Sequence, residues 1–320
     1  MRRLLKIFGV LFGLLAIAFV VFRTPDTDAA EMRVKYAGEP SRFVELGDGT
    51  TVHLRDEGPR DGTPIILLHG SNADLHTWEP WAKQLRETYR VIRFDQVGHG
   101  LTGPAPDGDY STDAFVADIR EVADALDLQS FILGGNSMGG SHTVAYAMKH
   151  SDRLDGIVLV DAGGADIRKE GGGNIGFSIA RTPVINLLME HITPRSLVKQ
   201  SLEQSVSNQA IVTEAAVDRY WEMLRYPGNR RATIARFSRG WAGFDAQSVS
   251  AIDVPALIIW GTEDSLIPVE AGRWYDQQIP NSTLVEYPGI GHLPHEEAPS
   301  ATIADLSEWL TGLVPDQQAP

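Results

Sequence analysis

One serine stands in a setting that suits a nucleophile. Ser137 is the centre of a GxSxG pattern at 135–139, between an apolar run and a helix-like run. The flanking glycines allow a sharp turn that would push the hydroxyl above the end of a strand, and the N-terminus of the next helix would favour developing negative charge. The chain has no cysteine, so a thiol nucleophile is excluded. The pattern predicts nucleophilic chemistry at the Ser137 hydroxyl.

A serine hydroxyl needs a general base, and the base needs an acid that holds its tautomer. Asp264 and His292 each close a strand-like run, on a loop of the kind where catalytic groups of open α/β sheets collect. We therefore predict Asp264 as the acid and His292 as the base. Asp161, at the end of an earlier strand-like run, is a rival acid, and Glu263 is a weaker one.

A tetrahedral intermediate also needs two backbone donors aimed at its oxyanion. Met138 follows the nucleophile, so its N–H is predicted as the first donor. The second is predicted to be the N–H of Ser71, in the loop after an earlier strand-like run, with Asn72 as the alternative. Trp78 and Asn136 are predicted to contact substrate.

Strand-like and helix-like runs alternate along most of the chain. The strand-like runs are rich in Ile, Leu and Val, as in a parallel sheet buried on both faces. They lie at 64–70, 89–96, 130–137, 155–162, 254–264 and 282–292, after an alternating hairpin pattern at 41–57. About 75 residues after Ala162 show helical patterns only, which predicts an inserted cap. The predicted division is 31–162 and 246–320 for an α/β core, and 163–245 for the cap.

The first 30 residues differ from the rest of the chain. A basic start, MRRLLK, precedes sixteen consecutive residues without a polar side chain, Ile7 to Phe22. This pattern predicts an uncleaved membrane anchor with the catalytic domain outside the cytoplasm, because the basic end should stay inside. A cleaved signal peptide, which would release a secreted protein, and a buried N-terminal helix are the alternatives.

Net charge and motif context argue against nucleic acid, a dinucleotide cofactor and a metal ion. The chain holds 28 Lys and Arg against 42 Asp and Glu, a net charge of −14, which disfavours nucleic acid. The GxGxxG match at 171–176 follows a polar run where a dinucleotide site requires a strand. His292 and His295 are separated by Pro294, which breaks the helix that could pair them around a metal. We therefore expect neither cofactor nor metal, and a hinge into the cap at 171–176.

Five motifs in this order resemble the α/β-hydrolase superfamily, in its capped serine-hydrolase branch. They are HGSN (69–72), FDQVGHG (94–100), GNSMGG (135–140), WGTED (260–264) and GIGHLPHEEAP (289–299). The resemblance implies an α/β-hydrolase fold, with a mostly parallel central sheet flanked by helices and an inserted helical cap. It also implies structural roles for five residues, Asp95, Gly98, Gly100, His69 and His99.

The activity implied by this resemblance is hydrolysis of a small-molecule carboxylic ester through an acyl-enzyme, as in a carboxylesterase. Carbon–carbon bond hydrolysis of ring-fission diketones is the alternative, because GNSMGG also resembles the elbow of those hydrolases; lactone hydrolysis is another. A non-catalytic binding protein of the same fold would be marked by loss of a triad residue, and Ser137, Asp264 and His292 are all present. The sequence does not set the acyl length or the oligomeric state.

Overall fold

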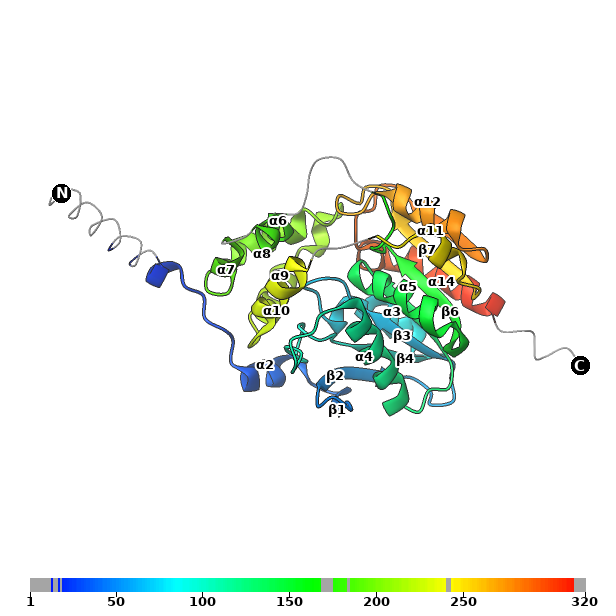
Figure 1. The fold of residues 1–320 in the computed structure, drawn as a ribbon, viewed down its shortest axis with the longest axis horizontal. Coiled ribbons are helices and arrows are strands. Elements are labelled where there is room, and N and C mark those ends of the chain that lie inside the picture. The colour runs from blue at the N-terminus through cyan, green and yellow to red at the C-terminus, as the bar shows by residue number, and fades with distance from the viewer. Residues whose placement is uncertain are drawn as a thin grey trace, which may run out of the picture.

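The computed structural model describes residues 13, 17, 19–167, 175–182, 185–239 and 243–313. Within them, eight strands form one sheet in the order β1-β2-β4-β3-β5-β6-β7-β8 (Figure 1). The strands are β1 Ser41–Glu45, β2 Thr51–Glu57, β3 Pro64–Leu68, β4 Arg90–Phe94, β5 Phe131–Asn136, β6 Leu154–Val160, β7 Ala256–Gly261 and β8 Ser282–Tyr287.

The sheet is antiparallel at one edge and parallel elsewhere. Strands β1 and β2 form the predicted hairpin, with Glu45 opposite Thr51, and β2 pairs antiparallel with β4. All the other pairings are parallel. The carboxyl ends of β5 to β8 therefore meet at one edge, where the predicted mostly parallel sheet would collect catalytic groups. The predicted fold class is confirmed.

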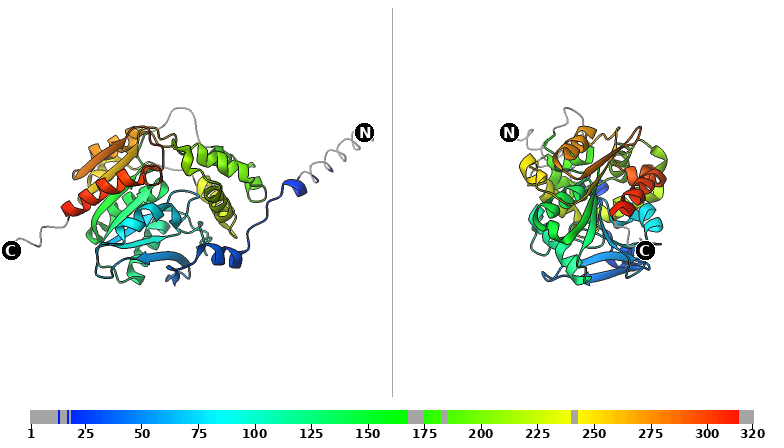
Figure 2. Two further views of the ribbon diagram at one scale, coloured as in Figure 1. Left: turned by 180° about the vertical axis from the view of Figure 1, so that it is seen from behind. Right: turned by 90° about the vertical axis from the view of Figure 1, so that its right-hand side faces the viewer.

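Helices cover both faces of the sheet. One face packs against α4, α5, α11 and α12, through side chains such as Val122, Val144 and Tyr275. The other face packs against α3 and α14 through Trp81 and Leu306, and Figure 2 shows α14 in front when the molecule is seen from behind. These helices are α3 Glu79–Leu85, α4 Thr112–Ala125, α5 Met138–His150, α11 Ala246–Ser250, α12 Val269–Gln278 and α14 Pro299–Leu313.

Between β6 and α11 the described chain contains helices only, and they lie together beside the carboxyl edge of the sheet (Figure 1). They are α6 Ile175–Arg181, α7 Ile185–Met189, α8 Arg195–Glu203, η3 Gln209–Ile211, α9 Glu214–Leu224 and α10 Asn229–Ser238. The short elements elsewhere are α2 Ala29–Tyr36, η1 Leu75–Trp78, η2 Ser151–Arg153 and α13 Pro294–Glu297. Residues 171–174 of the expected hinge lie outside the described residues.

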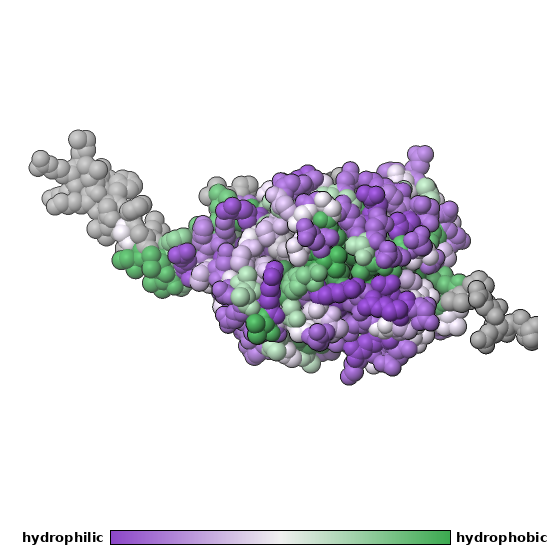
Figure 3. Space-filling model, turned by 90° about the horizontal axis from the view of Figure 1, so that it is seen from below, coloured by the Kyte–Doolittle hydropathy of each residue, from purple (hydrophilic) through white to green (hydrophobic). Residues whose placement is uncertain are grey.

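The prediction of an N-terminal membrane anchor is wrong. Within the part of the chain that the structure describes, no helix is long and apolar enough to cross a membrane. Most of residues 1–18 lie outside the described residues. The apolar run is also short, since sixteen helical residues cover about 24 Å against about 30 Å of hydrocarbon. Exposed hydrophobic residues do gather at 19–22, beside the grey N-terminal atoms in Figure 3.

The segment after this run lies along the predicted cap. Thr24 N donates to the His191 carbonyl at 2.8 Å, and Arg230 on α10 donates to the Thr24 carbonyl at 2.8 Å. Arg230 also forms an ion pair with Asp26 at 2.6 Å. Residues 24–26 are therefore attached to the helices between β6 and β7.

Asp118 on α4 is a half-buried acid whose ionisation should oppose folding. Its Oδ2 atom is buried without a hydrogen-bond partner, and burial, followed by Asp48 and Glu121, raises its pKa from 3.8 to about 7. The folded protein therefore holds a proton that the unfolded chain has released, so stability falls as pH rises from about 4 to about 7 and stays lower above that.

Asp118→Asn should consequently raise the free energy of unfolding at pH 8 by about 1 kcal/mol and leave it nearly unchanged below pH 4. Urea unfolding at the two pH values measures this difference. Asp113→Asn on the same helix is the control, because the Asp113 side chain is 78% exposed and should show no such pH dependence. Equal effects of the two substitutions at pH 8 would contradict the prediction.

Candidate active site

Ser137 lies at a strained turn between β5 and α5. Its backbone has φ 55° and ψ −114°, in the left-handed region that non-glycine residues rarely enter. A side chain on Gly135 would collide with the backbone of Gly139, and one on Gly139 would collide with the carbonyl of Leu68. The two glycines of the GxSxG pattern therefore permit the close packing that holds Ser137 at the end of the strand.

Asp264 and His292 form a buried hydrogen-bonded pair. His292 Nδ1 lies 2.7 Å from Asp264 Oδ2, while Asp264 Oδ1 accepts from the N–H groups of Leu266 at 2.7 Å and Ile267 at 3.0 Å. A carboxylate only accepts, so the imidazole hydrogen is on Nδ1. This tautomer leaves Nε2 with a free lone pair, as a general base requires.

Asn136 ties His292 to the strand that carries the nucleophile. Its side-chain amide donates to the carbonyls of Val160 and His292, each at 3.1 Å. Asn136 is 2% exposed and is not among the described residues that line the cavity. The structure thus gives the Asn136 side chain contacts to the His292 backbone and to β6, and no contact with the cavity that was predicted to hold substrate.

The two residues predicted as oxyanion donors both line the same cavity as Ser137. Met138 begins α5, so its N–H is one of the four that have no acceptor within the helix. Gly70 brings the Ser71 loop close, because a Cβ there would lie 3.1 Å from the Ser137 Cβ. The rival Asn72 has φ 60°, and its side-chain oxygen accepts from Thr233 at 3.0 Å.

Trp78 lies away from the cavity. Its ring is fully buried and stacks on His295, with ring centroids 4.2 Å apart and an interplanar angle of 29°. Because this packing against α13 and α3 uses the ring, Trp78 is not among the described lining residues. The expected substrate contact of Trp78 has no support in this arrangement.

The residues expected to be structural form a buried network behind the site. Asp95 accepts from the N–H groups of Leu75 and Leu101, each at 2.8 Å, and a side chain on Gly100 would collide with Asp95. His69 Nε2 accepts from the Gln96 N–H at 3.0 Å, and burial lowers the pKa of His69. Gly98 has φ 78°, and His99 contacts His69 edge to face.

The rival acid Asp161 lies beside the pair. One carboxylate oxygen of Asp161, one of Asp264 and one ring nitrogen of His292 all lie within 4.8 Å of one another. Asp161 Oδ1 accepts from the Gly261 N–H at 3.1 Å. Burial, with a further contribution from Asp264, raises the pKa of Asp161 well above its usual range, which favours the protonated, neutral form of Asp161.

These three side chains could also suit a metal ion, but their hydrogen bonds favour a proton. A metal at His292 Nδ1 would displace the hydrogen shared with Asp264 and change the tautomer. We therefore expect dialysis against EDTA to leave the hydrolytic rate unchanged. A rate that falls and returns with added zinc would contradict this expectation.

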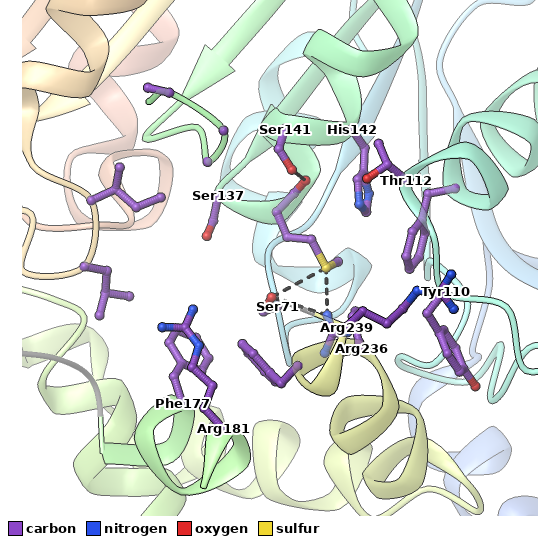
Figure 4. Close-up of a pocket in the computed structure, with 18 of the residues that line it drawn as sticks. Ser71, Tyr110, Thr112, Ser137, Ser141, His142, Phe177, Arg181, Arg236 and Arg239 are labelled. Atoms are coloured by element: carbon purple, nitrogen blue, oxygen red, sulfur yellow. Dashed lines mark hydrogen bonds between the residues drawn. The ribbon is translucent and has the colours of Figure 1, made fainter. Parts of the chain in front are cut away.

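A cavity of about 910 Å³ lies between the strand ends and the helices that follow β6. Figure 4 shows Ser137 at one side and Phe177, Arg181 and Arg236 at the other. Arg236 and His142 are among its polar residues that were not predicted from the sequence. Burial and Arg236 lower the pKa of His142 to about 3, so this imidazole is neutral at neutral pH. Sequence pattern could not identify either residue, since helix periodicity does not say which face meets a cavity.

The fold of the described residues, a mostly parallel eight-stranded sheet flanked by helices, is that of an α/β hydrolase. A family model described as the alpha/beta hydrolase fold matches residues 63–299, and the chain belongs to that family. It is similar to 2-hydroxy-6-oxo-2,4-heptadienoate hydrolase of Pseudomonas putida, at 26% identity over 281 residues, covering 85% of this chain and 96% of the relative.

Two solved structures are similar over nearly their full lengths. A meta-cleavage product hydrolase from Pseudomonas fluorescens has a TM-score of 0.75 at 23% identity, covering 85% of this chain and 98% of that chain. An esterase from Rhodococcus has a TM-score of 0.71 at 25% identity, covering 86% and 99%. Ester and carbon–carbon bond hydrolases thus occur among similar proteins, and the chain is a hydrolase of this family.

Proposed function

We propose that the chain is a serine hydrolase that cleaves carboxylic esters through an acyl-enzyme. The observation that carries this proposal is the 2.7 Å hydrogen bond between Asp264 and His292, in a site where Asn136, the residue before Ser137, donates to the His292 carbonyl. This arrangement supports a base beside a nucleophile at a strained turn.

In the proposed mechanism, Ser137 Oγ attacks the ester carbonyl while His292 Nε2 takes the hydroxyl proton. The oxyanion accepts from the N–H groups of Met138 and Ser71. The C–O bond to the alcohol then breaks, and His292 returns its proton to the departing alkoxide. Water, deprotonated by His292, attacks the acyl-enzyme carbonyl. The bond from the acyl carbon to Ser137 Oγ then breaks, Ser137 Oγ takes the proton back from His292, and the acid is released. Asp264 stays ionised throughout and stabilises the imidazolium.

Hydrolysis of a carbon–carbon bond in a ring-fission diketone is the second candidate, and it is favoured by the similarity to the Pseudomonas putida hydrolase. The loop at 69–72, HGSN, holds one glycine, whereas that branch typically has a glycine-richer loop. Lactone hydrolysis would use the same residues.

A panel of p-nitrophenyl esters of graded acyl length, run beside one vinylogous ring-fission diketone, tests the proposal. We expect ester turnover with kcat/KM above that of the diketone, and labelling by a fluorophosphonate. Diketone cleavage with the higher kcat/KM would assign the chain to the second candidate. An absence of turnover and labelling would favour a binding protein.

A further inference from the structure

The cavity beside Ser137 carries positive charge in an acidic protein. Three arginines line it, Arg181, Arg236 and Arg239, and no aspartate or glutamate is among its described lining residues. The whole chain has a net charge of −14. The positive charge is therefore local to this cavity, and the arginines that carry it come from helices on the cap side of the site (Figure 4).

The three guanidinium groups differ in their partners. Arg239 forms an ion pair with Asp109 at 3.1 Å. Among the residues that the structure describes, neither Arg236 nor Arg181 has an ion pair. The contacts of Arg236 are to neutral atoms: the Ser71 hydroxyl at 3.3 Å, the Asn72 side-chain oxygen at 3.4 Å and the Met138 sulfur at 2.7 Å.

Arg236 is half-buried, and its charge is not balanced by these contacts. Burial lowers the pKa of Arg236 to about 10, so the guanidinium remains protonated at neutral pH. Arg181 and Arg236 both lie against the ring of Phe237, with 5.5 Å and 5.4 Å from guanidinium carbon to ring centroid. Two cations lie around one apolar ring, and no described carboxylate pairs with either of them, so an anion would stabilise this site.

The position of Arg236 relates this charge to the reaction. Its contacts reach Ser71 and Met138, the two residues whose N–H groups we assign to the oxyanion, and all three line the cavity of Ser137 (Figure 4). An anionic group on Arg236 would therefore lie within the same cavity as the ester carbonyl at Ser137. Guanidinium binds carboxylate and phosphate oxygens with paired hydrogen bonds.

We propose that the substrate is an anionic ester, whose carboxylate or phosphate group binds Arg236, with Arg181 as a second cation from α6. This inference rests on the proposed ester hydrolysis and specifies its substrate class. A monoester of a short dicarboxylic acid would bring a carboxylate on the acyl side, and an acylglycerol phosphate would bring a phosphate on the alcohol side.

Matched substrates that differ in charge test the inference. Mono-p-nitrophenyl glutarate is compared with p-nitrophenyl pentanoate, and 1-butyrylglycerol 3-phosphate is compared with 1-butyrylglycerol. We expect the wild-type enzyme to prefer the anionic member of at least one pair, and the responding pair tells carboxylate from phosphate. Preference for the neutral member of both pairs would overturn the inference.

Arg236→Gln should lower the ratio of kcat/KM, anionic over neutral ester, by about 10- to 100-fold. Arg236→Lys, which keeps the charge, should retain part of the ratio. Arg231→Gln is the control on the same helix, because the Arg231 side chain is 77% exposed and should not change the ratio. Equal losses on both esters in Arg236→Gln would mean that Arg236 only supports the Ser71 loop, and would overturn the inference.

Binding to an inactive variant separates this inference from the proposed function. Ser137→Ala should be stabilised in a thermal shift by monoethyl glutarate or by 1-butyrylglycerol 3-phosphate, and the double variant with Arg236→Gln should not. If neither anion stabilises Ser137→Ala, the anion site is disproved even where neutral esters are hydrolysed. If the anions stabilise Ser137→Ala but the wild-type protein hydrolyses no ester, the anion site is supported and the proposed ester hydrolysis is contradicted.

Discussion

Ser137→Ala should lower ester turnover by about 10⁴-fold or more and abolish labelling by a fluorophosphonate, with the fold intact. The loss should be this large because the substitution removes the oxygen that attacks the ester carbonyl, and without that attack no oxyanion forms for the two N–H donors to stabilise. The Ser137 backbone, at φ 55°, is strained for alanine as for serine, so the strain itself should be unchanged.

Steady-state kinetics, fluorophosphonate labelling and circular dichroism measure the effect of this change. Ser130→Ala is the matched control, since Ser130 stands at the opposite end of the same strand and its hydroxyl donates to Asp155 at 2.9 Å. It should keep full activity and labelling. Full labelling of Ser137→Ala would place the nucleophile at another residue.

Asp264→Asn should lower kcat by about 10⁴-fold, whereas Asp161→Asn should cost less than about 10-fold. The Asp264 carboxylate accepts from His292 Nδ1 at 2.7 Å, and an amide that turns its NH₂ toward the ring would favour the wrong tautomer. Burial and the Asp264 carboxylate raise the pKa of Asp161 and favour its protonated form, so a neutral amide should be a close substitute for Asp161.

The two variants are controls for each other, because both replace a buried carboxyl that has an oxygen within 4.8 Å of a His292 ring nitrogen. The pH dependence of kcat/KM adds a second readout: Asp161→Asn should keep the wild-type profile. An inactive Asp161→Asn beside a nearly wild-type Asp264→Asn would move the acid to the end of β6. It would then be Asp161 that orients His292.

The chemistry-bearing positions were readable from sequence because they are local. A GxSxG pattern between a strand and a helix marks Ser137, and Asp264 and His292 both follow strands. Parallel strands bring their carboxyl ends to one edge, so three separate loops were expected at one place before any distance was known. The hairpin at 41–57 and the mostly parallel sheet followed from hydrophobic pattern and turn residues for the same reason.

Other assignments depended on packing and differed from expectation. Trp78 follows the loop of Ser71, but its ring stacks on His295, more than 200 residues later in the chain. The ring is therefore buried in the core and does not line the cavity. The predicted membrane anchor, based on the hydropathy of residues 7–22, is contradicted by the finding that no helix within the described residues is long and apolar enough to cross a membrane. Sequence distance and apolar length do not reveal which surface a side chain meets.

The sequence by itself determined the class of fold, the order of the catalytic candidates and the absence of a thiol nucleophile, because each depends on residue identity and short-range pattern. Only the tertiary structure decided that the Asn136 amide reaches the His292 carbonyl, that Asp161 lies beside Asp264, and that Arg236 faces the cavity. These contacts join segments far apart in the chain. They are set by how the strand ends and helices pack, which no local period encodes.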